Sequence, residues 1–73
     1  MISLDKVKKN KLVYVKNVEG TSELTKRIME MGITKGVKII IKNFAPLGDP
    51  IEIQLRGFRL SIRKKDAQKI LIY

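Results

Sequence analysis

Cysteine and histidine are both absent from the 73 residues of this chain. Without cysteine there is no disulfide and no thiolate ligand. Without histidine, the commonest general base of enzymes and the imidazole ligand of zinc sites are also missing. Aromatic residues make up only 5% of the chain. The apolar core therefore has to hold the fold without covalent or zinc cross-links.

Long hydrophobic runs are missing too. No stretch approaches the ~20 apolar residues that span a bilayer, and the N-terminus lacks the apolar run of a signal peptide. We therefore expect a cytoplasmic protein. At 73 residues the chain fits one domain, residues 1–73, of a size that buries only about 60% of its unfolded surface.

Basic residues outnumber acidic ones by sixteen to seven, which gives a formal net charge of +9. Such a charge favours nucleic acid, anionic membrane surfaces or acidic protein surfaces, and does not choose among them. Many of the lysines are spread along the chain: Lys6, Lys8, Lys9, Lys11, Lys64 and Lys65. We favour a solvated surface that keeps a small apolar domain soluble over a dedicated nucleic-acid face.

Residues 45–50, with the sequence APLGDP, interrupt two clear strand patterns. Residues 37–44 place alternate isoleucines on one face, and residues 51–56 alternate apolar and polar side chains. The two prolines cannot lie inside a central strand, and Gly48-Asp49 is a turn dipeptide. The pattern predicts a stiff loop from which the chain re-enters a sheet at Ile51.

The remaining pattern predicts a small, mostly β domain. Residues 3–11 form a polar entry segment in which Ser3 caps a turn and Leu4 and Val7 point inward. Thr21 or Ser22 caps a short amphipathic helix that ends at Gly32. The predicted strands are residues 12–18, 37–44, 51–56, 58–63 and 69–73, with one helical turn at 64–68. Five short strands favour a curled barrel, with the helix covering one open end.

A two-residue hairpin is predicted at Arg56-Gly57. The apolar phase moves from odd to even positions across this dipeptide, so that Leu55 and Phe58 pair on the same face of the sheet.

No catalytic or metal-binding pattern stands out. The acidic residues are scattered over different elements and are expected to face solvent: Asp5, Glu19, Glu23, Glu30, Asp49, Glu52 and Asp66. They do not form the spacing of a cation site or of a general acid–base pair, and no glycine-rich loop precedes the helix. We therefore predict no enzyme, no cofactor and no metal site.

Basic side chains in the second half of the chain could follow a phosphate backbone. They are Lys38, Lys42, Arg56, Arg59 and Arg63. Proteins that bind single strands usually add aromatic stacking platforms, for which only Tyr14 and Tyr73 remain here. A small basic nucleic-acid-binding barrel is the alternative function.

Leu47 is an apolar side chain between two prolines. It has two readings: a lid that tucks over the end of the barrel, or an anchor that fits a pocket in a partner protein. The sequence leaves both open.

Three segments together resemble the FeoA family of bacterial ferrous-iron transport accessory proteins. They are residues 26–36 (KRIMEMGITKG), residues 45–53 (APLGDPIEI) and residues 56–63 (RGFRLSIR). Their order along the chain is more specific than any one of them. The chain departs from the family at residues 9–11, where many members carry a Pro-Gly turn, and in its lysine-rich surface.

The resemblance implies an SH3-like β-barrel that works in the cytoplasm as a non-catalytic adaptor in ferrous-iron uptake. The partner that it implies is the FeoB permease, through its cytosolic GTPase domain, which would hold the chain at the inner membrane. The link to a transition metal ion lies in this transport role, and no residue is assigned as an iron ligand. The residues expected to bind the partner are Met31, Gly32, Leu47, Gly48, Asp49, Arg59 and Arg63. The strand that ends at Tyr73 would pair with a second copy if it were an open edge.

Overall fold

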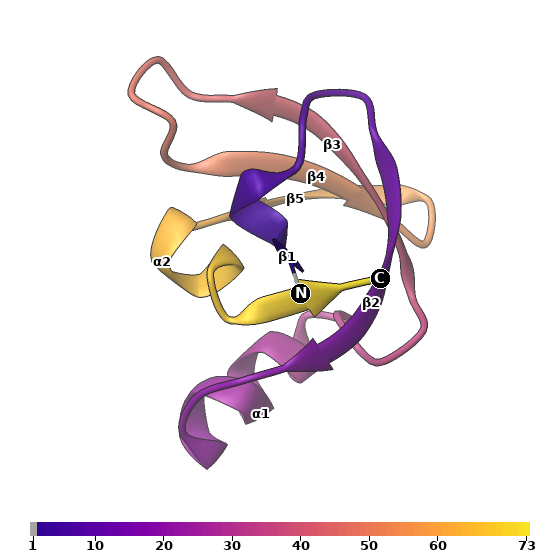
Figure 1. The fold of residues 1–73 in the computed structure, drawn as a ribbon, viewed down its shortest axis with the longest axis vertical. Coiled ribbons are helices and arrows are strands. Elements are labelled where there is room, and N and C mark those ends of the chain that lie inside the picture. The colour runs from indigo at the N-terminus through magenta and orange to yellow at the C-terminus, as the bar shows by residue number, and fades with distance from the viewer. Residues whose placement is uncertain (1) are drawn as a thin grey trace.

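One strongly curled antiparallel sheet carries the fold in the computed structural model, which describes residues 2–73 (Figure 1). The elements in chain order are β1 (Ile2–Ser3), the 3-10 helix η1 (Leu4–Lys6), β2 (Leu12–Val18), α1 (Ser22–Glu30), β3 (Lys38–Phe44), β4 (Ile51–Leu55), β5 (Phe58–Ile62), α2 (Lys64–Ala67) and β6 (Ile70–Ile72). The six strands lie in the order β1-β6-β2-β3-β4-β5. The sheet stays open between β1 and β5, and its curvature makes the domain barrel-like.

Alternation of side chains explains the strands. In β2, Val13 and Val15 are buried while Tyr14 between them is exposed, as expected for a strand with one face on the core. Between β4 and β5, Arg56 and Gly57 both have positive φ (50° and 82°), which is the geometry of a type I′ turn. The predicted hairpin and its register are confirmed, because Leu55 pairs with Phe58.

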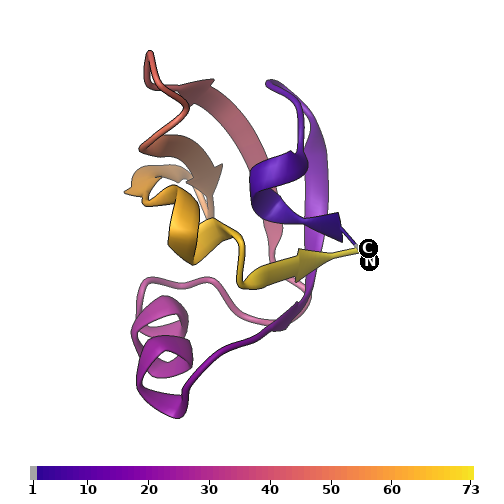
Figure 2. The ribbon, with the colours of Figure 1, turned by 60° about the vertical axis from the view of Figure 1, so that its left-hand side comes forward.

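The helix α1 begins and ends where the sequence predicts. The Thr21 side chain accepts a hydrogen bond from the Leu24 amide at 3.1 Å. At the other end Gly32 has a φ of 95°, and the amide of Ile33 donates to the Ile28 carbonyl at 3.4 Å. The side chains of Ile28 and Ile33 are fully buried, so α1 covers one end of the curled sheet (Figure 2).

The core lies on the concave side of the sheet. It is almost entirely aliphatic and is made of Leu4, Val7, Val13, Val15, Ile28, Ile33, Ile39, Ile41, Ile51, Ile53, Leu55, Ile62, Ala67, Ile70 and Ile72. Leu4 from η1 and Ala67 from α2 are fully buried, which confirms that the entry segment contributes to the core. These two short elements lie inside the curl of the sheet (Figures 1 and 2).

The two ends of the chain differ from the sequence expectation. A sixth strand, β1, pairs Ile2 with Ile72 and Ser3 with Leu71. The strand β6 therefore lies between β1 and β2 and is not an edge strand. The expected pairing with a second copy required an open edge at the Tyr73 strand, and that condition is not met. The entry turn forms, but Ser3 donates its hydroxyl hydrogen bond to Asp5 and does not cap η1 with its side chain.

Two carboxylates that were expected to face solvent are buried. Asp66 is 7% exposed and receives two hydrogen bonds from Arg27, at 3.2 and 3.3 Å. The side chain of Asp5 is fully buried, and its nearest cation is the Lys6 ammonium at 3.9 Å. The prediction was wrong for Asp66 because its partner, Arg27, is 39 residues away in the sequence. The partners of Asp5, Ser3 and Lys6, are local, and its burial follows from the fold around it. The Arg27–Asp66 pair links α1 to α2 across the open side of the sheet.

The centre of the sheet should be sensitive to small losses of volume. Ile53 is fully buried between Ile41 and Leu60 on the neighbouring strands. We expect Ile53→Val to lower the free energy of unfolding by about 0.5–1.5 kcal/mol, because one methylene leaves a packed site. Urea denaturation measures this. Leu47→Ala is the control and should change the free energy of unfolding by less than about 0.5 kcal/mol; a larger effect there would mean that Leu47 packs.

The link between α1 and α2 can be tested separately. We expect Arg27→Gln to lower the free energy of unfolding by about 1–2 kcal/mol, because the buried Asp66 carboxylate loses its hydrogen-bond donor. Lys26→Gln is the matched control: it removes the same charge one residue away, from an exposed side chain, and should have little effect. Equal effects of the two changes in thermal or urea denaturation would contradict a specific role for this pair.

Candidate protein-docking surface

The loop between β3 and β4 is held in place at both its base and its side. The amide of Ala45 donates to the carbonyl of Pro50 at 3.0 Å, and the amide of Gly48 donates to the carbonyl of Ala45 at 2.7 Å. The Asp49 carboxylate accepts a hydrogen bond from the Lys64 amide at 2.9 Å, at the start of α2. The loop is therefore stiff, as predicted, although it contains no regular secondary structure.

Leu47 lies at the tip of this loop with 94% of its surface exposed. The lid reading is therefore wrong, since a lid would be covered by the barrel end. An almost fully solvated leucine on a loop that is held by three hydrogen bonds contributes little to the core. The anchor reading stays a prediction.

Arg63 lies next to this loop, because it directly precedes the Lys64 amide that Asp49 binds. Leu47, Gly48, Asp49, Arg63 and Lys64 thus form one surface, called here the loop surface. It combines an exposed apolar tip with two basic side chains, Arg63 and Lys64, which are both exposed.

Met31 and Gly32 lie elsewhere. A Cβ on Gly32 would be 3.6 Å from the Leu55 side chain and 4.0 Å from the Phe58 ring, so the end of α1 packs on the β4–β5 turn. The guanidinium of Arg56 donates to the Thr34 hydroxyl at 3.3 Å and fastens the same corner. This corner is at the Phe58 end of β5, whereas the loop surface is at the Ile62 end.

The predicted docking residues therefore form two groups at opposite ends of β5, about 14 Å apart along the strand. Figure 1 shows the β3–β4 loop and α1 at opposite ends of the molecule. Arg59 lies between the groups, and its guanidinium is paired with Glu52 at 3.1 Å. Their role in binding a partner stays a prediction.

Phe58 pairs with Leu55 across the hairpin, as predicted, but 46% of its surface is exposed. The exposure follows from its place at the start of β5, which pairs only with β4. The alternation identifies the inner face correctly and does not show that the strand lies at the edge of the sheet.

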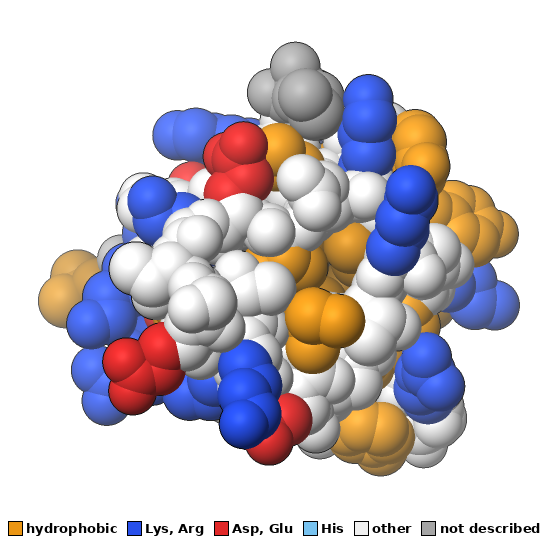
Figure 3. Space-filling view, turned by 90° about the horizontal axis from the view of Figure 1, so that it is seen from below, with side chains coloured by type: hydrophobic (Ala, Val, Ile, Leu, Met, Phe, Trp, Pro, Cys, Tyr) orange, Lys and Arg blue, Asp and Glu red, His pale blue; other side chains and the backbone are white. Residues whose placement is uncertain are grey.

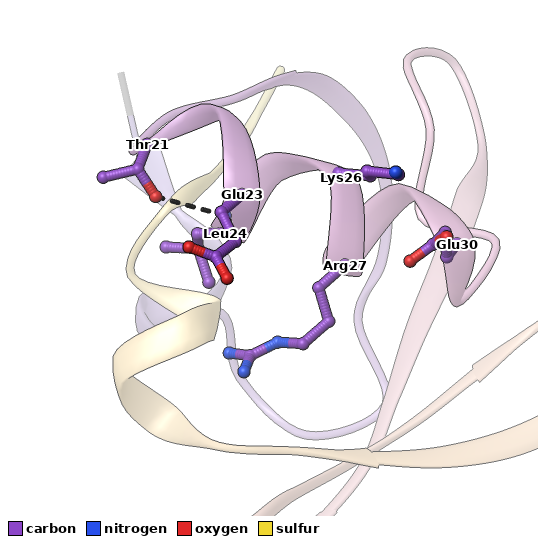
Figure 4. Close-up of a pocket in the computed structure, with 6 residues that line it drawn as sticks. All are labelled: Thr21, Glu23, Leu24, Lys26, Arg27 and Glu30. Atoms are coloured by element: carbon purple, nitrogen blue, oxygen red, sulfur yellow. Dashed lines mark hydrogen bonds between the residues drawn. The ribbon is translucent and has the colours of Figure 1, made fainter.

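A shallow hollow of about 520 Å³ lies along α1 (Figure 4). It is lined by Thr21, Glu23, Leu24, Lys26, Arg27 and Glu30. Arg27 extends away from α1 toward the segment that contains α2, where it meets Asp66, while Lys26 and Glu30 point to the other side. Arg27 therefore points away from Lys26 and Glu30, and the hollow does not bring these three side chains together as catalytic groups.

Within residues 2–73, no three acidic, histidine or cysteine side chains come close enough together to hold a metal ion. The same part of the chain contains no helix of the length and apolarity needed to cross a bilayer.

Comparisons with known proteins agree on one family. The model of the FeoA domain family matches residues 2–73. A curated relative, the Fe(2+) transport protein A/Fe(2+) transporter FeoB fusion protein of Porphyromonas gingivalis, is 42% identical over 53 residues, which are 73% of this chain and 6% of that protein. The chain thus spans only a small fraction of the fusion protein's length.

Two solved structures have the same fold. The NMR structure of a FeoA-like protein from Clostridium acetobutylicum is 42% identical, with a TM-score of 0.92 over 99% of this chain and 84% of that one. The zinc complex of FeoA from Stenotrophomonas maltophilia, described as a procaryotic SH3 domain protein, has a TM-score of 0.85 at 19% identity, over 100% of this chain and 91% of that one. The second likeness supports the fold alone and confirms the expected SH3-like barrel.

The hydrogen bond from Lys64 to Asp49 should fix the orientation of the loop. We expect Asp49→Ala to speed hydrogen exchange of the Lys64 amide severalfold, because that amide loses its acceptor. Asp49→Asn keeps an acceptor oxygen and should exchange nearly as slowly as the parent chain. If both variants exchange like the parent, the loop is held by its other contacts.

Proposed function

The chain belongs to the FeoA family, and on this basis we propose that it is a non-catalytic accessory domain of ferrous-iron uptake. It acts by binding the cytosolic GTPase domain of a FeoB-type permease. It works in the cytoplasm and is peripheral to the inner membrane through that partner.

The fusion of a FeoA segment to a FeoB transporter in P. gingivalis carries this proposal. A covalent linker keeps two domains at a high effective concentration, so that even a weak contact between them is occupied. Whether or not the two domains share a chain, each still needs a surface at which they meet. The loop surface is the best candidate for it.

The loop surface combines an ordered backbone with an exposed apolar side chain. Interfaces obtain most of their affinity from a few apolar or aromatic anchors that enter a pocket, surrounded by a polar rim. Leu47 is an apolar side chain that is already in place, so binding costs little conformational entropy. Arg63 and Lys64 supply a basic rim. The complementary site on the GTPase domain is an apolar pocket with acidic residues at its edge.

The end of α1 and the exposed ring of Phe58 form a second contact region at the other end of β5. A partner that spans β5 from the loop surface to Met31 would also cover Arg59. Because the loop surface and this second region are separate, a substitution that abolishes binding at one should leave the other able to bind.

We expect Leu47→Asp to weaken binding to the GTPase domain at least roughly tenfold, because a charge replaces the apolar anchor. The variant should keep the stability of the parent, since Leu47 is 94% exposed. Isothermal titration calorimetry with the purified GTPase domain measures the affinity.

Tyr73→Asp is the matched control, because it places the same charge on another exposed side chain, on a different face of the molecule. It should bind the GTPase domain as the parent does. If Leu47→Asp binds like the parent, the loop surface is not the docking site. A parent chain that does not bind the GTPase domain would contradict the proposal. If it instead binds duplex DNA with a steep salt dependence, the chain is a nucleic-acid-binding barrel.

A further inference from the structure

A second hollow, of about 450 Å³, lies where the entry segment meets the last strand. Its lining is Ile2, Lys6, Val7, Lys8, Lys11, Val13, Ile72 and Tyr73. The valines and Ile72 belong to the buried core and form an apolar floor. Lysines, Ile2 and Tyr73 form the rim.

The rim presents apolar side chains to solvent in a fixed position. Ile2 is 55% exposed and Tyr73 is 72% exposed, although both are in or next to paired strands. The amide of Tyr73 donates to the Tyr14 carbonyl at 3.2 Å, and the Lys16 ammonium lies 5.7 Å from the centre of the Tyr73 ring. The ring is therefore held at the surface by its backbone and by a cation–π contact.

The charge of this region is one-sided. Residues 2–18 contain five lysines, which are Lys6, Lys8, Lys9, Lys11 and Lys16. Their only acid is Asp5, whose side chain is fully buried. Figure 3, seen from the α1 end, shows Lys and Arg side chains around much of the outline of the molecule, among hydrophobic ones.

We propose that this face, made of Ile2, Lys6, Lys8, Lys11 and Tyr73 and called the lysine–tyrosine face, binds the surface of an anionic phospholipid membrane. Lysines near such a surface are attracted by its negative potential without needing a fixed geometry. Tyrosine prefers the level of the headgroups, where its ring and its hydroxyl are both accommodated. Exposed Ile2 adds the hydrophobic part of interfacial binding.

The same features argue against duplex DNA as the ligand. Phosphate contacts would use the lysines but would leave the exposed Ile2 side chain without an apolar partner. A membrane uses all of these groups together. The inference does not depend on the proposed function, because it rests on a face that shares no residue with the loop surface.

The test uses the full chain and vesicles of phosphatidylcholine, with and without phosphatidylglycerol, at moderate salt. We expect sedimentation with the vesicles that contain phosphatidylglycerol and not with pure phosphatidylcholine. The chain has no tryptophan, so Tyr73→Trp provides a single fluorescent reporter. Its emission should shift to the blue on binding, and binding without a shift would contradict insertion of this face.

Two triple variants with the same change of charge separate a specific face from general attraction. Lys6→Gln, Lys8→Gln and Lys11→Gln together should weaken vesicle binding on the order of a hundredfold. Lys64→Gln, Lys65→Gln and Lys69→Gln remove three other exposed lysines and should have a much smaller effect. Equal losses would overturn the proposal. So would tighter binding to duplex DNA than to vesicles at the same salt, with the same dependence on Lys6, Lys8 and Lys11.

Discussion

Burial of an aliphatic face inside one curled sheet is the constraint on which this structure depends. The sheet is too small to close on itself, and the chain has no cysteine with which to fasten it. Short elements from outside the sheet therefore seal the core: Leu4 from η1, Ile28 from α1 and Ala67 from α2 are all fully buried. The Arg27–Asp66 pair then joins two of these elements on the open side. The segments that join the strands are therefore short and ordered. Exposed side chains on such segments are held in place, which lowers the entropy cost of binding a partner.

Local patterns in the sequence predict most of the fold because they act over a few residues. Alternation identifies the strand at 12–18, positive φ at Gly57 is expected from the hairpin dipeptide, and Thr21 marks the helix start. The errors concern contacts between distant segments. The pairing of β1 with β6 joins the two ends of the chain, and Asp66 is buried against an arginine 39 residues away. Neither relation leaves a periodic signal in the sequence.

The candidate site was predictable in part. The loop at 45–50 and its stiffness follow from its prolines. The exposure of Leu47 excludes the lid reading and leaves the anchor reading a prediction. The sequence could not show that Met31 and Leu47 lie at opposite ends of β5, because that distance depends on the curl of the sheet. The resulting arrangement suits an adaptor, since the loop surface and the lysine–tyrosine face are separate. Taken together, the two proposals describe a domain that contacts a membrane surface and a protein partner at the same time.

The most direct measurement is an NMR titration of the isotope-labelled chain with the cytosolic GTPase domain of the permease from the same organism. Docking through the loop surface predicts amide shifts that cluster at Leu47, Gly48 and Lys64 and leave Tyr14 and Tyr73 unchanged. The absence of shifts, or shifts confined to the two tyrosines and their neighbours, would contradict the account of how this domain meets its partner.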